Sequence, residues 1–200
     1  MGRIVVTEFV SLDGVVEDPG GSEDFKYGGW SFEFDRGPEG NEFKLDEARA
    51  SEALLLGRVT YEGFAEAWPS REGEFADKMN SMPKYVVSST LTRPEWTNST
   101  VIEPGDLVAA VSKLKQEADG DVVVHGSAQL AQTLIAHDLV DEYRLYVFPV
   151  VLGTGKRLFG RGTVPTGMRL VRNETTSGGI AYLAYERAGA PAFGSLLLAE

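Results

Sequence analysis

Residues 121–159 read DVVVHGSAQLAQTLIAHDLVDEYRLYVFPVVLGTGKRLF, and the prediction of the fold starts from this stretch. The β-branched run at 122–124 is typical of a buried strand. His125-Gly126-Ser127 ends the run, and the residues that follow carry apolar side chains at helical spacing: Leu130, Ala131, Leu134 and Ile135. A second strand is predicted over 143–151, before a second glycine turn at 152–156. The stretch therefore predicts strand, tight turn, helix and strand.

The turn at Gly126 suits a phosphate group. The first N–H groups of a helix have no partner within the helix, and the helix dipole favours negative charge at that end. Gly126 lets a ligand approach the backbone closely. Many strand–glycine–helix turns bind nothing, so a plain chain reversal is the structural alternative.

The amino-acid composition limits the classes of protein to which this chain can belong. Two hundred residues suit one domain, expected over 1–187, followed by an apolar tail over 188–200. Hydrophobic residues make up 42% and charged residues 24%, as in soluble globular proteins. The chain has no cysteine and only two histidines, which argues against disulfides, iron–sulfur clusters and zinc sites. We therefore expect no metal.

Charge and hydropathy limit the kinds of partner that the protein is expected to bind. The first residues, MGRIVVTEFV, lack the pattern of a signal peptide, and no run reaches the roughly 18 apolar residues of a membrane span. We expect a cytoplasmic protein with no membrane partner. The net charge of −11 argues against nonspecific nucleic-acid binding, which needs a basic surface.

Strands and helices alternate along the chain. Strands are predicted over 3–10, 53–56, 84–87 and 99–103, and helices over 42–52, from Arg58 onward, and over 106–118. The segments 168–176 and 180–186 alternate like a hairpin around Ser177-Gly178-Gly179. This order predicts an α/β fold, with a mixed, mostly parallel sheet, helices on both faces and a C-terminal antiparallel hairpin. Residues 17–41 read as a functional loop or lid.

Three strand ends carry groups that suit phosphate. They are Gly57-Arg58-Val59-Thr60 (the Gly57 turn), Ser88-Ser89, and Gly126-Ser127-Ala128-Gln129 (the Gly126 turn). Ligands of such sheets bind beyond the carboxyl ends of the strands, so the three could hold a dinucleotide together. The G-x-G-x-x-G fingerprint is absent, which argues against a Rossmann domain. The alternatives are a surface salt bridge for Arg58 and helix or turn capping for the serines.

The same residues carry a family resemblance. The segments SLDGVV, LLLGRVTYEGF, VVSSTL, VVHGSAQL and LVDEYRLYVFPVVLGTGKRLF, with the closing hairpin, resemble the dihydrofolate reductase superfamily. The resemblance covers about 3–187. It is closest to the branch that includes the reductase domain of bacterial riboflavin biosynthesis, and it implies the three-layer fold of that superfamily.

The resemblance implies NADPH as the cofactor. Carried over by position, Arg58, Ser88 and Ser89 would face the 2′-phosphate of the adenosine. Thr60 and the Gly126 turn, with Ser127, Ala128 and Gln129, would hold the pyrophosphate, and residues 13–16, including Val16, would border the nicotinamide. A guanidinium matches a phosphate with a planar fork of donors, which agrees with the role implied for Arg58.

Two positions depart from the family pattern. Asn41 stands where dihydrofolate reductases place the acid that binds the pterin, with Glu42 beside it. Ser127 replaces the usual second glycine of the Gly126 turn and adds a hydroxyl. Asp13 and Glu42 are the acids predicted to supply a proton, with Glu8 third because a carboxylate in so apolar a strand is unusual. Tyr146 could orient a water.

The sequence thus predicts an NADPH-dependent reductase of a small heteroaromatic or carbonyl-type substrate. The alternatives are a true dihydrofolate reductase or 5-amino-6-(5-phosphoribosylamino)uracil reductase, and a nucleotide-binding protein with little turnover. A homodimer is expected, because the hairpin lies at a sheet edge and the tail is apolar, with Phe193 and Leu196-Leu197-Leu198.

Overall fold

The computed structural model describes residues 1–194, and an eight-stranded sheet runs through its centre. The order of the strands is β4-β3-β2-β5-β1-β6-β8-β7. Their bounds are β1 (Arg3–Ser11), β2 (Ser51–Gly57), β3 (Lys84–Val87), β4 (Ser99–Ile102), β5 (Asp121–His125), β6 (Glu142–Phe148), β7 (Met168–Thr175) and β8 (Ala181–Arg187). The pairs from β4 to β6 are parallel, and β8 pairs antiparallel with both β6 and β7. The predicted fold class is confirmed.

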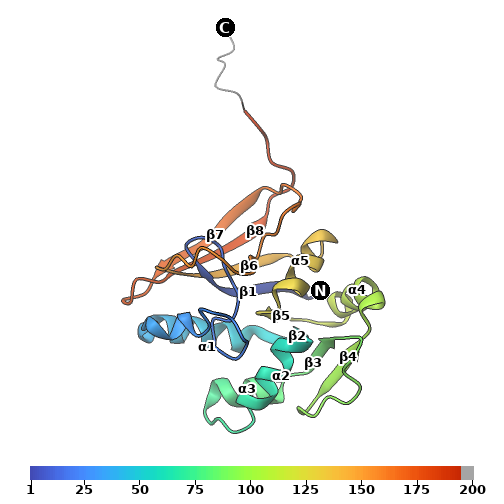
Figure 1. The fold of residues 1–200 in the computed structure, drawn as a ribbon. Coiled ribbons are helices and arrows are strands. Elements are labelled where there is room, and N and C mark those ends of the chain that lie inside the picture. The colour runs from blue at the N-terminus through green and yellow to red at the C-terminus, as the bar shows by residue number, and fades with distance from the viewer. Residues whose placement is uncertain (195–200) are drawn as a thin grey trace.

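Helices cover both faces of the sheet (Figure 1). They are α1 (Gly37–Ala50), α2 (Arg58–Ala67), α3 (Glu74–Ser81), α4 (Leu107–Glu117) and α5 (Ala128–Ala136), with short 3-10 helices η1 (Trp30–Glu33) and η2 (Pro104–Asp106). Side chains of β2 alternate between the faces: Leu54 and Leu56 pack with α2 and α3, whereas Leu55 packs with α4 and α5. The layers are therefore helix, sheet and helix.

β1 is the central strand of this arrangement, between β5 and β6. Ile4, Val6 and Val10 belong to the core that α4 and α5 cover. Phe9 packs on the opposite face, with the aromatic core next to α1. Because both faces are covered, the polar residues of β1 are buried as well, and their chemistry depends on their neighbours.

Most elements lie within about two residues of the predicted bounds, and two differ by more. α1 begins at Gly37 rather than Glu42, because Pro38 fits the first turn of a helix and Asp35 Oδ1 accepts a hydrogen bond from the Gly37 N–H (2.8 Å). β6 ends at Phe148 rather than at residue 151, because Pro149 has no N–H to donate to a neighbouring strand.

The chain continues past β8 without a further helix or strand among the described residues. Phe193 is 83% exposed there. Leu196-Leu197-Leu198, which the sequence analysis assigned to an interface, lie outside the described residues. In the part of the chain that the structure describes, no helix is long and apolar enough to cross a membrane.

Candidate functional site

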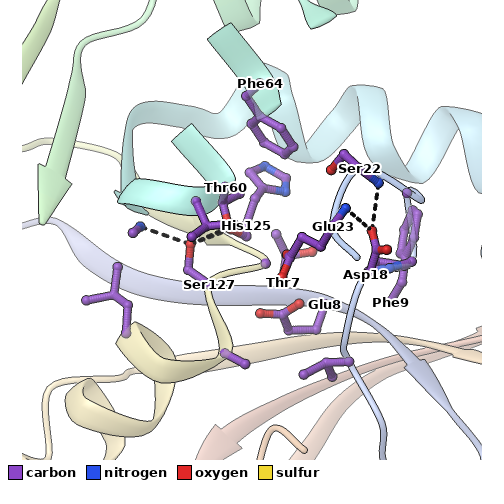
Figure 2. A pocket seen from close by; sticks show the side chains of 18 of the residues that line it. Thr7, Glu8, Phe9, Asp18, Ser22, Glu23, Thr60, Phe64, His125 and Ser127 are labelled. Atoms are coloured by element: carbon purple, nitrogen blue, oxygen red, sulfur yellow. Dashed lines mark hydrogen bonds between the residues drawn. The ribbon is translucent and has the colours of Figure 1, made fainter. Parts of the chain in front are cut away.

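A cavity of about 1350 Å³ lies at the carboxyl ends of β1, β2, β3 and β5. This volume exceeds the roughly 300–1,000 Å³ of an ordinary ligand pocket, so the cavity has room for a cofactor and a substrate. It brings together all nine residues that the resemblance assigns to the cofactor: Val16, Arg58, Thr60, Ser88, Ser89, Gly126, Ser127, Ala128 and Gln129. In Figure 2, Thr60 and Ser127 lie on one side of the cavity, Phe9 and Asp18 lie on the other, and Glu8 lies between them.

The hydroxyl of Ser127 joins the two glycine turns. It accepts a hydrogen bond from the Gly57 N–H (2.9 Å) and donates one to Thr60 Oγ1 (2.9 Å). Ser127 adopts the left-handed conformation with φ 60°, which costs a non-glycine residue free energy. Serine in place of the family's glycine therefore fixes the Gly126 turn against the Gly57 turn.

The Gly126 turn lines the cavity and lies close to Thr60. Gly126 has φ 55°, and a Cβ there would lie 3.3 Å from Thr60 Oγ1. The helix bond from the Ala131 N–H to the Ser127 carbonyl is the first of α5, so the preceding N–H groups have no partner in the helix. The turn therefore presents free N–H groups and the positive end of a helix dipole to the cavity.

The three polar residues near the ends of β2 and β3 differ in whether other groups of the protein already bind their side chains. Arg58 lines the cavity and pairs with Glu62 at 2.7 Å on the surface of α2. Ser88 Oγ accepts hydrogen bonds from the N–H groups of Thr90 (3.1 Å) and Leu91 (2.9 Å), so it caps its own turn. Ser89 is exposed at the cavity wall.

The loop before α1 forms the opposite wall. The Val16 N–H donates to the carbonyl of Lys156 (2.9 Å), and Trp30 Nε1 donates to the carbonyl of Glu17 (2.8 Å). Asp18 Oδ1 accepts hydrogen bonds from the N–H groups of Ser22 (2.8 Å) and Glu23 (3.0 Å). The segment predicted as a lid is thus anchored at several points and contributes to the wall of the cavity.

Asp13, predicted as a proton donor, lies outside the cavity lining. Its carboxylate accepts hydrogen bonds from Ser11 Oγ (2.7 Å) and from the N–H groups of Leu152 (3.1 Å) and Gly153 (2.9 Å). These contacts lower the pKa of Asp13 to about 2, so it stays ionised. Asp13 binds the loop after β6 to the turn after β1, so its contacts in this structure are structural, and its role as a proton donor stays a prediction.

The two other predicted groups are also absent from the cavity lining. Glu42 lies on the exposed face of α1 and pairs with Arg49 at 3.0 Å, because the helical spacing turns Asn41 and Lys44 toward the cavity instead. Tyr146 is fully buried in the aromatic core, where burial raises the pKa of its phenol. Neither side chain is placed to exchange a proton with a ligand in the cavity.

Glu8 is the acid that does line the cavity. It is 2% exposed, and its Oε1 has no hydrogen-bond partner among residues 1–194. Burial raises the pKa of Glu8 well above the ordinary 4.5, although the charge of Lys44 opposes this shift. Burial therefore favours the protonated form of this carboxyl group, which faces the cavity.

A buried ion pair on α1 lies next to Glu8. Lys44 Nζ donates to Glu47 Oε1 (2.7 Å) and to Thr7 Oγ1 (2.9 Å). The charges of Lys44 and Arg144 outweigh burial and hold the pKa of Glu47 below its usual value. Burial, reinforced by Lys44, lowers the pKa of His125 to about 3, so the imidazole is neutral at physiological pH.

Sequence reasoning missed three residues of the cavity. Lys44 and Arg36 line it from α1 and the preceding loop, and His125 lines it from β5. The unusual carboxylate of β1 was a signal for Glu8. No signal in the sequence marked Lys44, because a Lys and a Glu three positions apart on a helix normally form an exposed pair. Among residues 1–194, no three His, Asp or Glu side chains gather closely enough to hold a metal ion.

Comparisons of the sequence with known proteins give one family. Residues 3–182 match the model of the RibD C-terminal domain. The chain is 29% identical over 188 residues to YyaP of Bacillus subtilis (strain 168), covering 92% of this chain and 94% of YyaP. It is 32% identical over 161 residues to YwjB of the same strain, covering 80% of this chain and 84% of YwjB.

Solved structures share the fold. A riboflavin biosynthesis protein from Shewanella sp. PV-4 superposes with TM-score 0.69 at 22% identity, covering 92% of this chain and 98% of that one. Dihydrofolate reductase from Enterococcus faecalis, complexed with NADP(H), superposes with TM-score 0.60 at 14% identity, covering 93% of this chain and 96% of that one. The three-layer fold of the dihydrofolate reductase superfamily is therefore confirmed.

Proposed function

The chain belongs to the RibD C-terminal domain family, which is reductase-like, and on that premise we propose that it is an NADPH-dependent reductase of a small heteroaromatic or carbonyl-type substrate. One observation carries the proposal: a single cavity joins phosphate-suited turns to a buried acid, Glu8, whose pKa is raised by burial. NADPH supplies a hydride, and reduction then also needs a proton source.

The residues on the β2–β5 side fit a phosphorylated cofactor. The Gly126 turn offers free N–H groups to a pyrophosphate, and Thr60 is fixed beside it through Ser127. Arg58 would meet the 2′-phosphate. Its present pair with Glu62 is a surface (i, i+4) pair worth about 0.3–0.5 kcal/mol, whereas a charged hydrogen bond contributes about 1.5–3 kcal/mol. Loss of this surface pair would therefore cost little when Arg58 binds a phosphate.

Glu8 is the proposed proton donor. Donation from a positioned acid contributes typically about 10²- to 10⁴-fold to a rate. Lys44 and Thr7 lie beside it in the wall of the cavity, where they would help to position the substrate. His125, whose imidazole is neutral, lines the cavity as an uncharged group that can form hydrogen bonds.

Two alternatives stay testable. A pterin reductase would bind its substrate through an acid at the position of Asn41, which lines the cavity as a neutral amide. A nucleotide-binding protein with little turnover would bind NADPH without consuming it. Addition of candidate substrates to the NADPH complex, followed by the loss of reduced-nicotinamide absorbance, separates a reductase from a binding protein.

The first expected result concerns the choice of cofactor. The native protein should bind NADPH roughly ten- to a hundred-fold more tightly than NADH, the factor that about 1.5–3 kcal/mol of charged hydrogen bonding gives. Arg58→Ala should lose this preference and keep its fold. Calorimetric titration of both cofactors measures the two affinities directly.

The matched control is Arg161→Ala, which removes an exposed arginine outside the cavity lining. It should leave both affinities unchanged. Equal affinities for NADPH and NADH in the native protein would contradict the proposal for Arg58, and so would a preference that survives Arg58→Ala.

We also expect a homodimer. β7 is the edge of the sheet, and it carries Leu170 (43% exposed) and Val171 (39% exposed). An open edge with apolar residues favours pairing or cover. Light scattering during size-exclusion should give twice the chain mass of 21.7 kDa. Deletion of 188–200 tests the tail, and Leu170→Lys tests the edge; a mass of one chain for the native protein would exclude the dimer.

A further inference from the structure

The imidazole of His125 stands in the wall of the cavity at the end of β5, just before the Gly126 turn. Val124, the residue before it, packs into the core under α4 and α5, so the alternation of a strand turns His125 to the opposite face of the sheet. Its Cα is paired with that of Thr7 on β1. In Figure 2 the imidazole lies between Phe64 and Thr7.

The charge of this imidazole is set by its surroundings. Burial is the main cause that lowers the pKa of His125 to about 3, and the positive charges of Lys44 and Arg144 add to it, whereas Glu47 opposes them. Among residues 1–194, no hydrogen bond contributes to this shift. The ring is therefore neutral at physiological pH, with one nitrogen that can donate a hydrogen bond and one that can accept.

The charged neighbours of His125 are bound to partners of their own. Lys44 Nζ donates to Glu47 Oε1 (2.7 Å) and to Thr7 Oγ1 (2.9 Å). Arg144 pairs with two carboxylates, each at 2.6 Å. The half-buried imidazole takes no part in these contacts. A polar group that is largely withdrawn from water gains free energy when it finds a partner, so its N–H group suits an acceptor atom of a ligand.

An aromatic row leads away from His125 along the wall. The ring centroid of Phe64 lies 6.2 Å from that of His125 and 6.1 Å from that of Trp68, and Trp68 lies 5.2 Å from Phe75. All four side chains line the cavity. Arg71 covers the Trp68 ring at 4.5 Å, so the Phe64 end of the row is the part next to His125 that a ligand can meet. A flat, apolar ring packs well against such a wall.

We propose that the His125 imidazole donates a hydrogen bond to the carbonyl oxygen of an uncharged substrate whose flat ring packs against Phe64. Addition of a hydride to the carbonyl carbon places negative charge on this oxygen, and a hydrogen bond that strengthens as the charge develops stabilises the transition state. The oxygen takes its proton from Glu8 or from water, which completes the reduction to an alcohol, and His125 keeps its own proton. This inference rests on the proposed reductase function.

Nitrogen NMR observes the imidazole directly. The chain has only two histidines, and His137→Gln removes the exposed one, so the remaining long-range ¹H–¹⁵N signals belong to His125. We expect the signals of a neutral ring throughout the range between about pH 5 and pH 8. Acetophenone, titrated with and without the oxidised cofactor NADP⁺, which prevents turnover, should shift the protonated nitrogen. The hydrocarbon 2-phenylpropene, in which a CH₂ group replaces the carbonyl oxygen, should leave this signal almost unchanged.

Calorimetry of the same two probes assigns the affinity to the N–H group. His125→Leu should bind acetophenone about five-fold or more weakly than the native protein, and 2-phenylpropene within about two-fold of it. His125→Gln keeps an N–H donor and should retain most of the affinity for acetophenone. The matched control is His137→Leu, which removes an exposed histidine outside the cavity lining and should change neither affinity. Melting curves report whether each variant is folded.

The outcomes separate this inference from the reductase proposal. A charged ring in this pH range, no shift with acetophenone up to its solubility limit, or the same shift with both probes would overturn the role of His125. An affinity for acetophenone that survives His125→Leu would do so too, and if that variant does not fold, the NMR of the His137→Gln protein decides. Failure to bind NADPH, with the response to acetophenone intact, would remove the reductase proposal and leave the carbonyl contact in place.

Discussion

Glu8→Gln is expected to abolish reductase turnover and to make the protein more stable at neutral pH. Glutamine keeps the size of the side chain but cannot supply the proton, so the rate should fall by about 10²- to 10⁴-fold while NADPH binds normally. The gain in stability at neutral pH follows from the burial of the carboxyl group, which raises its pKa and so favours its ionisation on unfolding.

The sign of the pH dependence follows from the raised pKa of Glu8. Burial raises it well above 4.5, so the folded state holds this proton more tightly than the unfolded state. Below about pH 4.5 both states are protonated. As pH rises from there, the unfolded state ionises first, and the free energy of unfolding falls until the folded pKa is reached. Glutamine does not ionise, so Glu8→Gln should not show this fall in the free energy of unfolding.

Thermal melts between pH 4 and pH 8 measure the effect. Relative to the native protein, Glu8→Gln should gain stability as pH rises toward neutral, seen as a higher Tm, and should gain almost nothing near pH 4. Glu42→Gln is the matched control, because Glu42 is an exposed glutamate outside the cavity lining; it should change neither rate nor pH profile. A native rate in Glu8→Gln, or a stability difference that is flat with pH, contradicts the assignment.

Local sequence patterns predicted the framework of the site. The run at 122–124 and the helical spacing after Ala128 place the Gly126 turn at a strand end, and the parallel order of strands brings it next to the Gly57 turn. The strand, the turn and the helix depend on residues close together in the chain, so they can be read without the structure, whereas the pairing of β2 with β5 joins distant segments. The contact between Ser127 Oγ and Thr60 Oγ1, 67 residues apart, could not be read in this way.

The acids were harder to predict, because their states depend on residues far away in the sequence. Asp13 stands in a conspicuous motif, but the N–H groups that hold it ionised belong to Leu152 and Gly153, separated from it by 139 and 140 positions. The raised pKa of Glu8, on which its proposed role depends, comes from burial, because helices cover both faces of β1. Lys44 and Glu47 have the spacing of an exposed pair, and the packing of α1 against the sheet buries them.

Arg144→Met is expected to give the largest loss of stability. Arg144 lies on β6, with its side chain only 9% exposed. It pairs with Asp121 at 2.6 Å and Glu142 at 2.6 Å, and with Glu47 at 3.8 Å. Its removal leaves three buried carboxylates with less compensation. Loss of one partner from a buried charge network costs about 3–5 kcal/mol, or roughly 6–20 °C in Tm for a chain of this size.

The control is Arg169→Met on β7. Arg169 pairs with Glu186 at the surface, where its side chain is 65% exposed, and such pairs contribute about 0–1 kcal/mol. Denaturant unfolding of both variants gives the two free energies, which should differ by several kcal/mol. The Arg144 effect should also be less sensitive to added salt, because buried pairs are screened weakly.

A second substitution tests the cause of the loss. If Arg144→Met destabilises the fold through uncompensated negative charge, adding Glu142→Gln should recover part of the stability. If the loss comes from the missing side-chain volume, the double variant should be no more stable than Arg144→Met alone. A cost for Arg144→Met that matches the Arg169→Met control would show that the network has no net stabilising effect. Glu47, and through it Lys44 at the cavity wall, would then be positioned by the packing of α1 rather than by the charge of Arg144.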